Sequence, residues 1–60
     1  MEITIEMAMH FAGQWGLTWE VETYIQMGYT PREALEEWDC LPSKEELLDY
    51  MYGNINNIIL

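Results

Sequence analysis

Glu6 and His10 are the first residues of this sequence that could perform chemistry. They stand four residues apart, so on a helix they would share a face and could share a proton or a metal ion. A zinc site generally needs three or four protein ligands, whereas the chain has one His and one Cys with no paired spacing. We therefore expect a solvent-facing histidine beside a carboxylate, with no bound metal and no cofactor.

Cys40 is the second candidate, as a nucleophile. Glu36, Glu37 and Asp39 precede it closely, and negative neighbours raise the pKa of a thiol and so reduce the amount of reactive thiolate. The sequence also has no glycine-rich phosphate loop, no serine nucleophile elbow and no glycosidase-like carboxylate pair. These observations predict a small buried cysteine, no catalytic residue and no enzymatic activity.

The length and charge of the chain restrict its partners. Sixty residues bury only about 60% of their unfolded surface, which leaves no interior for a large cofactor, and we expect one small domain over residues 1–60. Eleven acidic residues against two basic ones give a formal net charge of -9. Nucleic acids and anionic membranes attract clustered Lys and Arg, so we expect neither as a direct partner.

Localisation follows from what the chain lacks in sequence. It has no apolar run long enough to span a membrane and no basic region ahead of an apolar run at its N-terminus. Its lone cysteine cannot form an internal disulfide, which agrees with a reducing compartment. We therefore expect a soluble, cytoplasmic protein without a signal peptide.

Capping patterns predict two helices in the second half of the chain. Thr30, with a proline directly after it and Glu33 three residues on, matches a capping box and predicts a helix over residues 31–39. The same pattern begins at Ser43 and predicts a helix that runs to about residue 52, because apolar residues recur there at spacings of three and four. The apolar C-terminus beyond it is expected to be less regular.

In the first half of the chain, the sequence predicts one helix clearly and leaves one segment ambiguous. An apolar series ends before Gly28, which predicts a helix with Thr18 as its N-cap and a left-handed glycine after its end. Over residues 2–15, apolar and polar residues alternate as in a strand, yet every fourth residue from Glu2 is polar, as on a helix. We predict a mainly α fold, a small domain of three to four short helices, with a β-strand as the alternative for the N-terminal segment.

Apolar residues make up half of the chain, so it is expected to fold despite its charge. In such a small core we expect most of the three Trp side chains inside and some Tyr side chains at an interface. Without a disulfide or a metal, association is the remaining stabiliser of so short a chain, and we predict a homodimer or a higher oligomer. Its contact is expected to use apolar residues near both ends of the chain, namely Met7, Met9, Phe11, Ile55, Ile58, Ile59 and Leu60.

Acidic residues concentrate in the second half of the chain. Glu33 and Glu37 would share one helix face and Glu45 and Asp49 another, and like charges four residues apart mildly destabilise a helix. The block indicates either a surface steered to a basic protein or a solvated face that keeps an apolar protein soluble. The partner-binding residues predicted from it are Glu33, Glu36, Glu37, Glu45, Glu46 and Asp49.

Residues 28–39, with the sequence GYTPREALEEWD, resemble segments of short acidic phage-encoded proteins of the host-takeover or anti-defence type. The likeness covers about a fifth of the chain. It implies a phage-encoded inhibitor that acts in the host cytoplasm and blocks a host or anti-phage defence protein. The alternative is a small structural or assembly factor of a phage or bacterial particle, chaperone-like, that works through apolar contacts. Salt should weaken the first kind of binding and spare the second.

Overall fold

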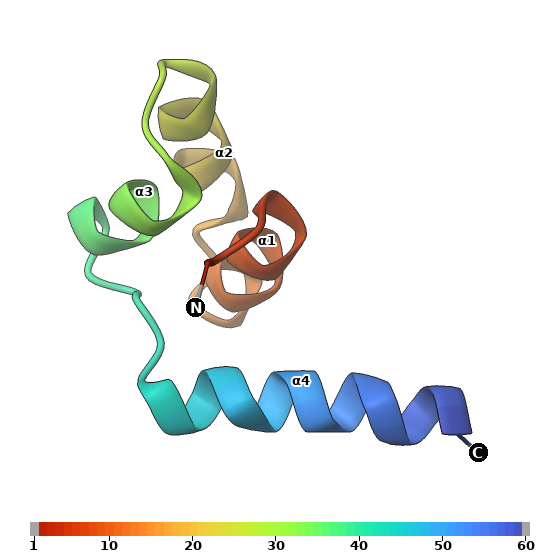
Figure 1. The fold of residues 1–60 in the computed structure, drawn as a ribbon. Coiled ribbons are helices and arrows are strands. Elements are labelled where there is room, and N and C mark those ends of the chain that lie inside the picture. Colours follow the sequence, from red (N-terminus) through yellow and green to blue (C-terminus); the bar gives the residue numbers. More distant parts are fainter. Residues whose placement is uncertain (1, 60) are drawn as a thin grey trace.

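The computed structural model describes residues 2–59, and the side chains of residues 2–53. These residues form four helices, α1 (Ile5–Gln14), α2 (Thr18–Gln26), α3 (Pro31–Glu37) and α4 (Lys44–Ile59). The first three helices lie together, and α4 runs along one side of them and continues past α1 (Figure 1). The predicted mainly helical fold is confirmed, and residues 2–59 contain no strand.

The ambiguous N-terminal segment is a helix. Thr4 has an extended backbone, with φ -81° and ψ 166°, and its Oγ1 accepts the backbone N–H of Met7 at 3.2 Å. This N-cap satisfies a donor that would otherwise lack a partner. The helix then buries the face formed by Met7, Ala8, Phe11 and Ala12. A strand would have placed Met7 and Ala8 on opposite faces, whereas the helix buries both.

Small side chains at the centre of the three-helix group set the size of the core. Ala8, Ala12 and Ala34 are fully buried, together with Val21 and Leu35. Alanine lets helices approach closely, so this centre has no room for large rings. The predicted burial of most Trp side chains is therefore wrong, since Trp15 is 67% exposed and Trp19 is 73% exposed; Trp38 is half-buried.

Each of the first three helices ends in a Schellman motif, in which two backbone N–H groups beyond the helix bond back to its last carbonyls. Gly28 closes α2 as predicted, with φ 109°, and the N–H of Tyr29 bonds to the carbonyl of Tyr24 at 3.1 Å. In α3 the left-handed position is taken by Asp39, with φ 53°. The left-handed backbone stops α3 at Glu37, two residues before the predicted end.

The predicted helix starts are confirmed at two of three places. Thr30 and Glu33 form a complete capping box, and Ser43 Oγ accepts the N–H of Glu46 at 3.2 Å. Thr18, however, is the first residue of α2, and the N-cap is Leu17. The tight turn after α1 brings Leu17 to φ -115° and ψ 21°, which leaves no extended residue for a side-chain cap.

The last helix extends farther than predicted. It continues past Tyr52 to Ile59, although it passes through Gly53. A glycine inside a helix costs about 1 kcal/mol relative to alanine, and each further residue of the helix adds a backbone hydrogen bond that offsets part of this cost. Among the α4 residues whose side chains the structure describes, 44–53, the buried Leu47 and the half-buried Tyr50 pack against the core.

Candidate functional site

His10 lies on the exposed side of α1 and connects it with α4. Its ring centroid is 4.7 Å from that of Tyr50 and 5.0 Å from that of Phe11. The side-chain amide of Gln14 donates to His10 Nε2 at a long N···N distance of 3.4 Å. Glu6, one turn earlier, is exposed. Within residues 2–53, no three His, Cys, Asp or Glu side chains are placed to hold a metal ion.

Cys40 is buried, as predicted, with 4% of its surface exposed. Burial raises the pKa of its thiol, and the negative charge of Asp39 raises it further. Both effects favour the protonated thiol over the reactive thiolate. Cys40 is the last residue of the Schellman motif of α3, since its N–H bonds to the carbonyl of Leu35 at 2.9 Å, and its side chain packs in the hydrophobic core.

All six acidic residues of the predicted partner-binding surface are exposed, but two of them also stabilise helix starts. Glu33 Oε1 accepts the N–H of Thr30 at 3.0 Å, and Glu46 Oε1 accepts the N–H of Ser43 at 3.2 Å. The hydrogen bonds from the Thr30 backbone and side chain lower the pKa of the Glu33 carboxyl. Glu33 and Glu46 therefore have structural roles at the starts of α3 and α4.

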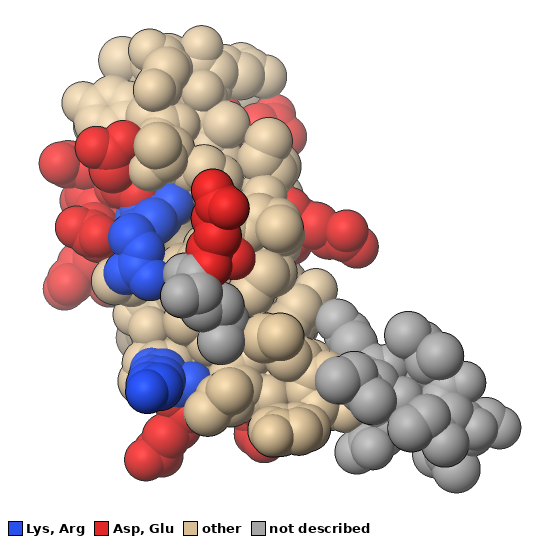
Figure 2. Space-filling view, viewed as in Figure 1, with Lys and Arg blue, Asp and Glu red and all other residues tan. Residues whose placement is uncertain are grey.

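The acids at the C-terminal end of α3 have no such role. Glu36 and Glu37 lie in the last turn of the helix and Asp39 just beyond it, and no basic residue stands in that turn. A helix carries partial negative charge at this end, so each carboxylate there opposes folding. In Figure 2 acidic side chains gather along the flank formed by α3 and again near the start of α4, with the basic side chains between them.

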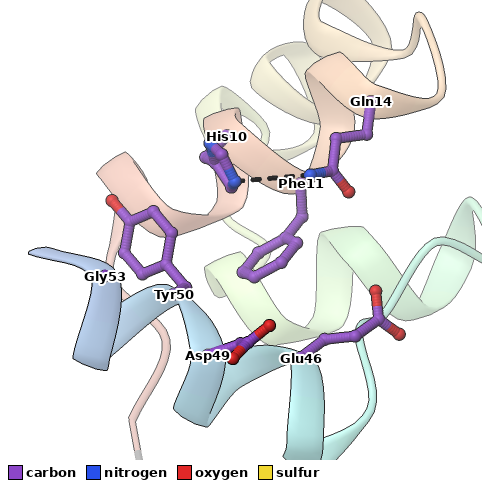
Figure 3. A pocket seen from close by; sticks show the side chains of 7 residues that line it. All are labelled: His10, Phe11, Gln14, Glu46, Asp49, Tyr50 and Gly53. Carbon is purple, nitrogen blue, oxygen red and sulfur yellow. Dashed lines mark hydrogen bonds between the residues drawn. The ribbon is translucent and has the colours of Figure 1, made fainter.

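A groove of about 610 Å³ lies between α1 and the middle of α4. Its lining residues are His10, Phe11, Gln14, Glu46, Asp49, Tyr50 and Gly53. Figure 3 shows the carboxylates of Glu46 and Asp49 on the α4 side, opposite Gln14 on α1, with the Phe11 and Tyr50 rings beside them. The centroids of these two rings are 5.6 Å apart. The site thus combines carboxylates with aromatic surface.

The structure describes the side chains of only some of the residues predicted to form the oligomer contact. Met7 and Phe11 are 9% and 3% exposed, because both lie on the buried face of the N-terminal helix α1. These two residues belong to the hydrophobic core of the single chain, and their role in a contact between copies stays a prediction. Met9 is half-buried. The side chains of Ile55, Ile58, Ile59 and Leu60 lie outside the described residues.

The groove joins two segments that are distant in the chain, and it was not predicted from the sequence. His10 and Gln14 share a face of α1 at a spacing of four, and Glu46, Asp49, Tyr50 and Gly53 recur at spacings of three and four on α4. These spacings were readable in the sequence. The sequence does not reveal that this face of α1 and this face of α4 lie opposite each other.

Comparison with known proteins gives no relative for this chain. No model of a known protein family, no curated protein sequence and no solved structure matches it. None of the helices in residues 2–59 combines the length and the apolar composition needed to cross a bilayer.

Proposed function

We propose that this protein binds a basic surface of another protein through the acidic side chains of α3 and the first half of α4, and so blocks that protein. The observation that carries the proposal is the crowding of Glu36, Glu37 and Asp39 at the C-terminal end of α3. Each carboxylate at such an end costs roughly 0.3–1 kcal/mol of helix stability. Lys and Arg side chains of a partner would offset this cost only in the complex.

The excess of charge supports the same interpretation. Two basic residues cannot neutralise eleven acidic ones, so the surface carries a negative field that accelerates encounters with a positively charged partner. The resemblance of residues 28–39 to short phage-encoded proteins points to a host or anti-phage defence protein as the target, in the host cytoplasm. The same field would repel nucleic acid and anionic membrane.

A second candidate is an assembly factor that works through apolar contacts, and one observation favours it. Leu48, Met51 and Tyr52 share a face of α4 and are 37%, 39% and 62% exposed. Apolar side chains at spacings of three and four form a stripe that another chain could cover. The proposed homodimer would use this stripe.

Affinity capture separates the two candidates. The wild-type protein is immobilised and incubated with a lysate of a candidate bacterial host at low and at high salt. Glu36→Lys with Glu37→Lys is the test variant, and Glu2→Lys with Glu22→Lys is the control, because it makes the same charge change at exposed positions outside the acidic C-terminal end of α3.

We expect a protein that the wild type and the control retain at low salt, and that high salt or the test variant releases. Retention that survives high salt and both variants would contradict the acidic-surface proposal and favour the apolar stripe of α4.

A further inference from the structure

The groove between α1 and α4 presents hydrogen-bond acceptors next to aromatic rings. The carboxylates of Glu46 and Asp49 stand on its α4 side (Figure 3). Because the Gln14 amide nitrogen donates to His10, the Gln14 Oε1 atom is left as an acceptor. One oxygen of Glu46 accepts from Ser43, which leaves the other available. Such a lining suits a ligand that only donates hydrogen bonds and carries a positive charge.

We infer that this groove takes the guanidinium group of one arginine side chain of the basic partner. The inference rests on the proposed function and names a central contact for it. An arginine side chain has five N–H donors, no acceptor and a permanent positive charge. Its charge complements Glu46 and Asp49, and its plane can stack on the exposed part of the Tyr50 ring, which is half-buried.

Arginine fits this lining better than lysine. The acceptors lie on both sides of the groove, with Asp49 on α4 and Gln14 on α1. A planar fork of donors reaches two separated acceptors at once, whereas an ammonium group concentrates its donors and charge at one point. The exposed part of the Tyr50 ring, whose centroid lies 5.6 Å from that of the buried Phe11, offers a flat apolar face on which a planar guanidinium stacks and an ammonium does not.

The probes are three blocked pentapeptides of glycine with arginine, lysine or citrulline at the centre. Citrulline keeps the shape of arginine without its charge. Each peptide is titrated into the ¹⁵N-labelled protein, and binding is followed by NMR chemical shifts. The test variant is Asp49→Asn, and the control is Glu22→Gln, which removes one charge from an exposed position on α2.

We expect saturable shifts at His10, Gln14, Asp49 and Tyr50 with the arginine peptide, and none with the citrulline peptide. The arginine peptide should bind about fivefold more tightly than the lysine peptide. Asp49→Asn should weaken the binding of the arginine peptide about tenfold, as expected when one charge-assisted hydrogen bond is lost, and Glu22→Gln should leave its affinity within about twofold.

Three results would overturn the inference: no saturable shifts in the groove, equal affinities for the arginine and lysine peptides, or equal effects of Asp49→Asn and Glu22→Gln. The last two would indicate diffuse attraction to the acidic surface, which leaves the proposed function standing. Failure of the proposed function would instead show in the affinity capture, as retention that neither salt nor charge reversal on α3 affects.

Discussion

Asp39 offers the sharpest test of the backbone geometry. Of the non-glycine residues in the described part of the chain, only Asp39 has a positive φ, 53°. A left-handed backbone costs an L-residue roughly 1–2 kcal/mol that glycine avoids, while glycine loses about 0.4–1 kcal/mol through the larger entropy of its unfolded chain. The Asp39→Gly variant should therefore be more stable than Asp39→Ala by about 0.5–1 kcal/mol.

Glu37 provides the matched control. It lies in the right-handed last turn of α3 and is exposed, so both positions lose one carboxylate at the same helix end. In a right-handed helix the order of stability reverses, so the glycine variant should be less stable than the alanine variant by up to about 1 kcal/mol. The difference in stability between the glycine and the alanine variant should thus have opposite signs at residues 39 and 37.

Thermal unfolding followed by far-ultraviolet circular dichroism measures both differences. One kcal/mol shifts the Tm of a domain of about this size by roughly 4–8 °C, so Asp39→Gly should melt about 2–8 °C above Asp39→Ala. Guanidinium unfolding of the same four variants checks that the transition remains cooperative. If alanine equalled or exceeded glycine at residue 39, the Schellman motif at the end of α3 would be refuted.

Three further outcomes are expected. Thr30→Ala and Ser43→Ala should each lower stability by about 1 kcal/mol through loss of an N-cap, and no change in the Tm of either variant would contradict the helix starts. The folded state lowers the pKa of Glu33. The Glu33 carboxylate therefore stabilises the folded state above its unfolded pKa, and this stabilisation is lost as the pH falls through its folded pKa. The Tm should therefore drop below about pH 4.3, and should drop less in Glu33→Gln, as a series of melts at different pH would show. Sedimentation at micromolar concentration should give at least twice the 7.1 kDa of one chain, with a lower mass for Met51→Asp; a wild-type monomer throughout would exclude the dimer.

Local chemistry explains which parts of the fold were predictable from the sequence. A capping box involves side chains three residues apart, so Thr30 and Glu33 reveal their role without any tertiary contact. Gly28 is equally local, since few other residues accept φ 109°. The left-handed role of Asp39 was less visible, because aspartate tolerates such a backbone without requiring it.

Tertiary packing explains what the sequence did not reveal. The exposure of Trp15 and Trp19 follows from how closely Ala8 and Ala34 let their helices approach, which composition alone does not give. The groove likewise depends on which face of α4 meets α1, and the ring contacts of His10 with Tyr50 join residues far apart in the chain. The exposed acids were predictable, whereas their division into capping and non-capping carboxylates needed the structure.

The association rate of the captured partner tests the central claim most directly, measured for the wild type, for Glu36→Lys with Glu37→Lys, and for Glu2→Lys with Glu22→Lys at two salt concentrations. Surface substitutions usually change stability by less than about 0.5 kcal/mol, so all three proteins should remain folded. We predict that only the Glu36→Lys, Glu37→Lys variant associates more slowly and with a flatter salt dependence. Equal rates and equal salt slopes for all three would show that the acids of α3 serve solubility and not binding.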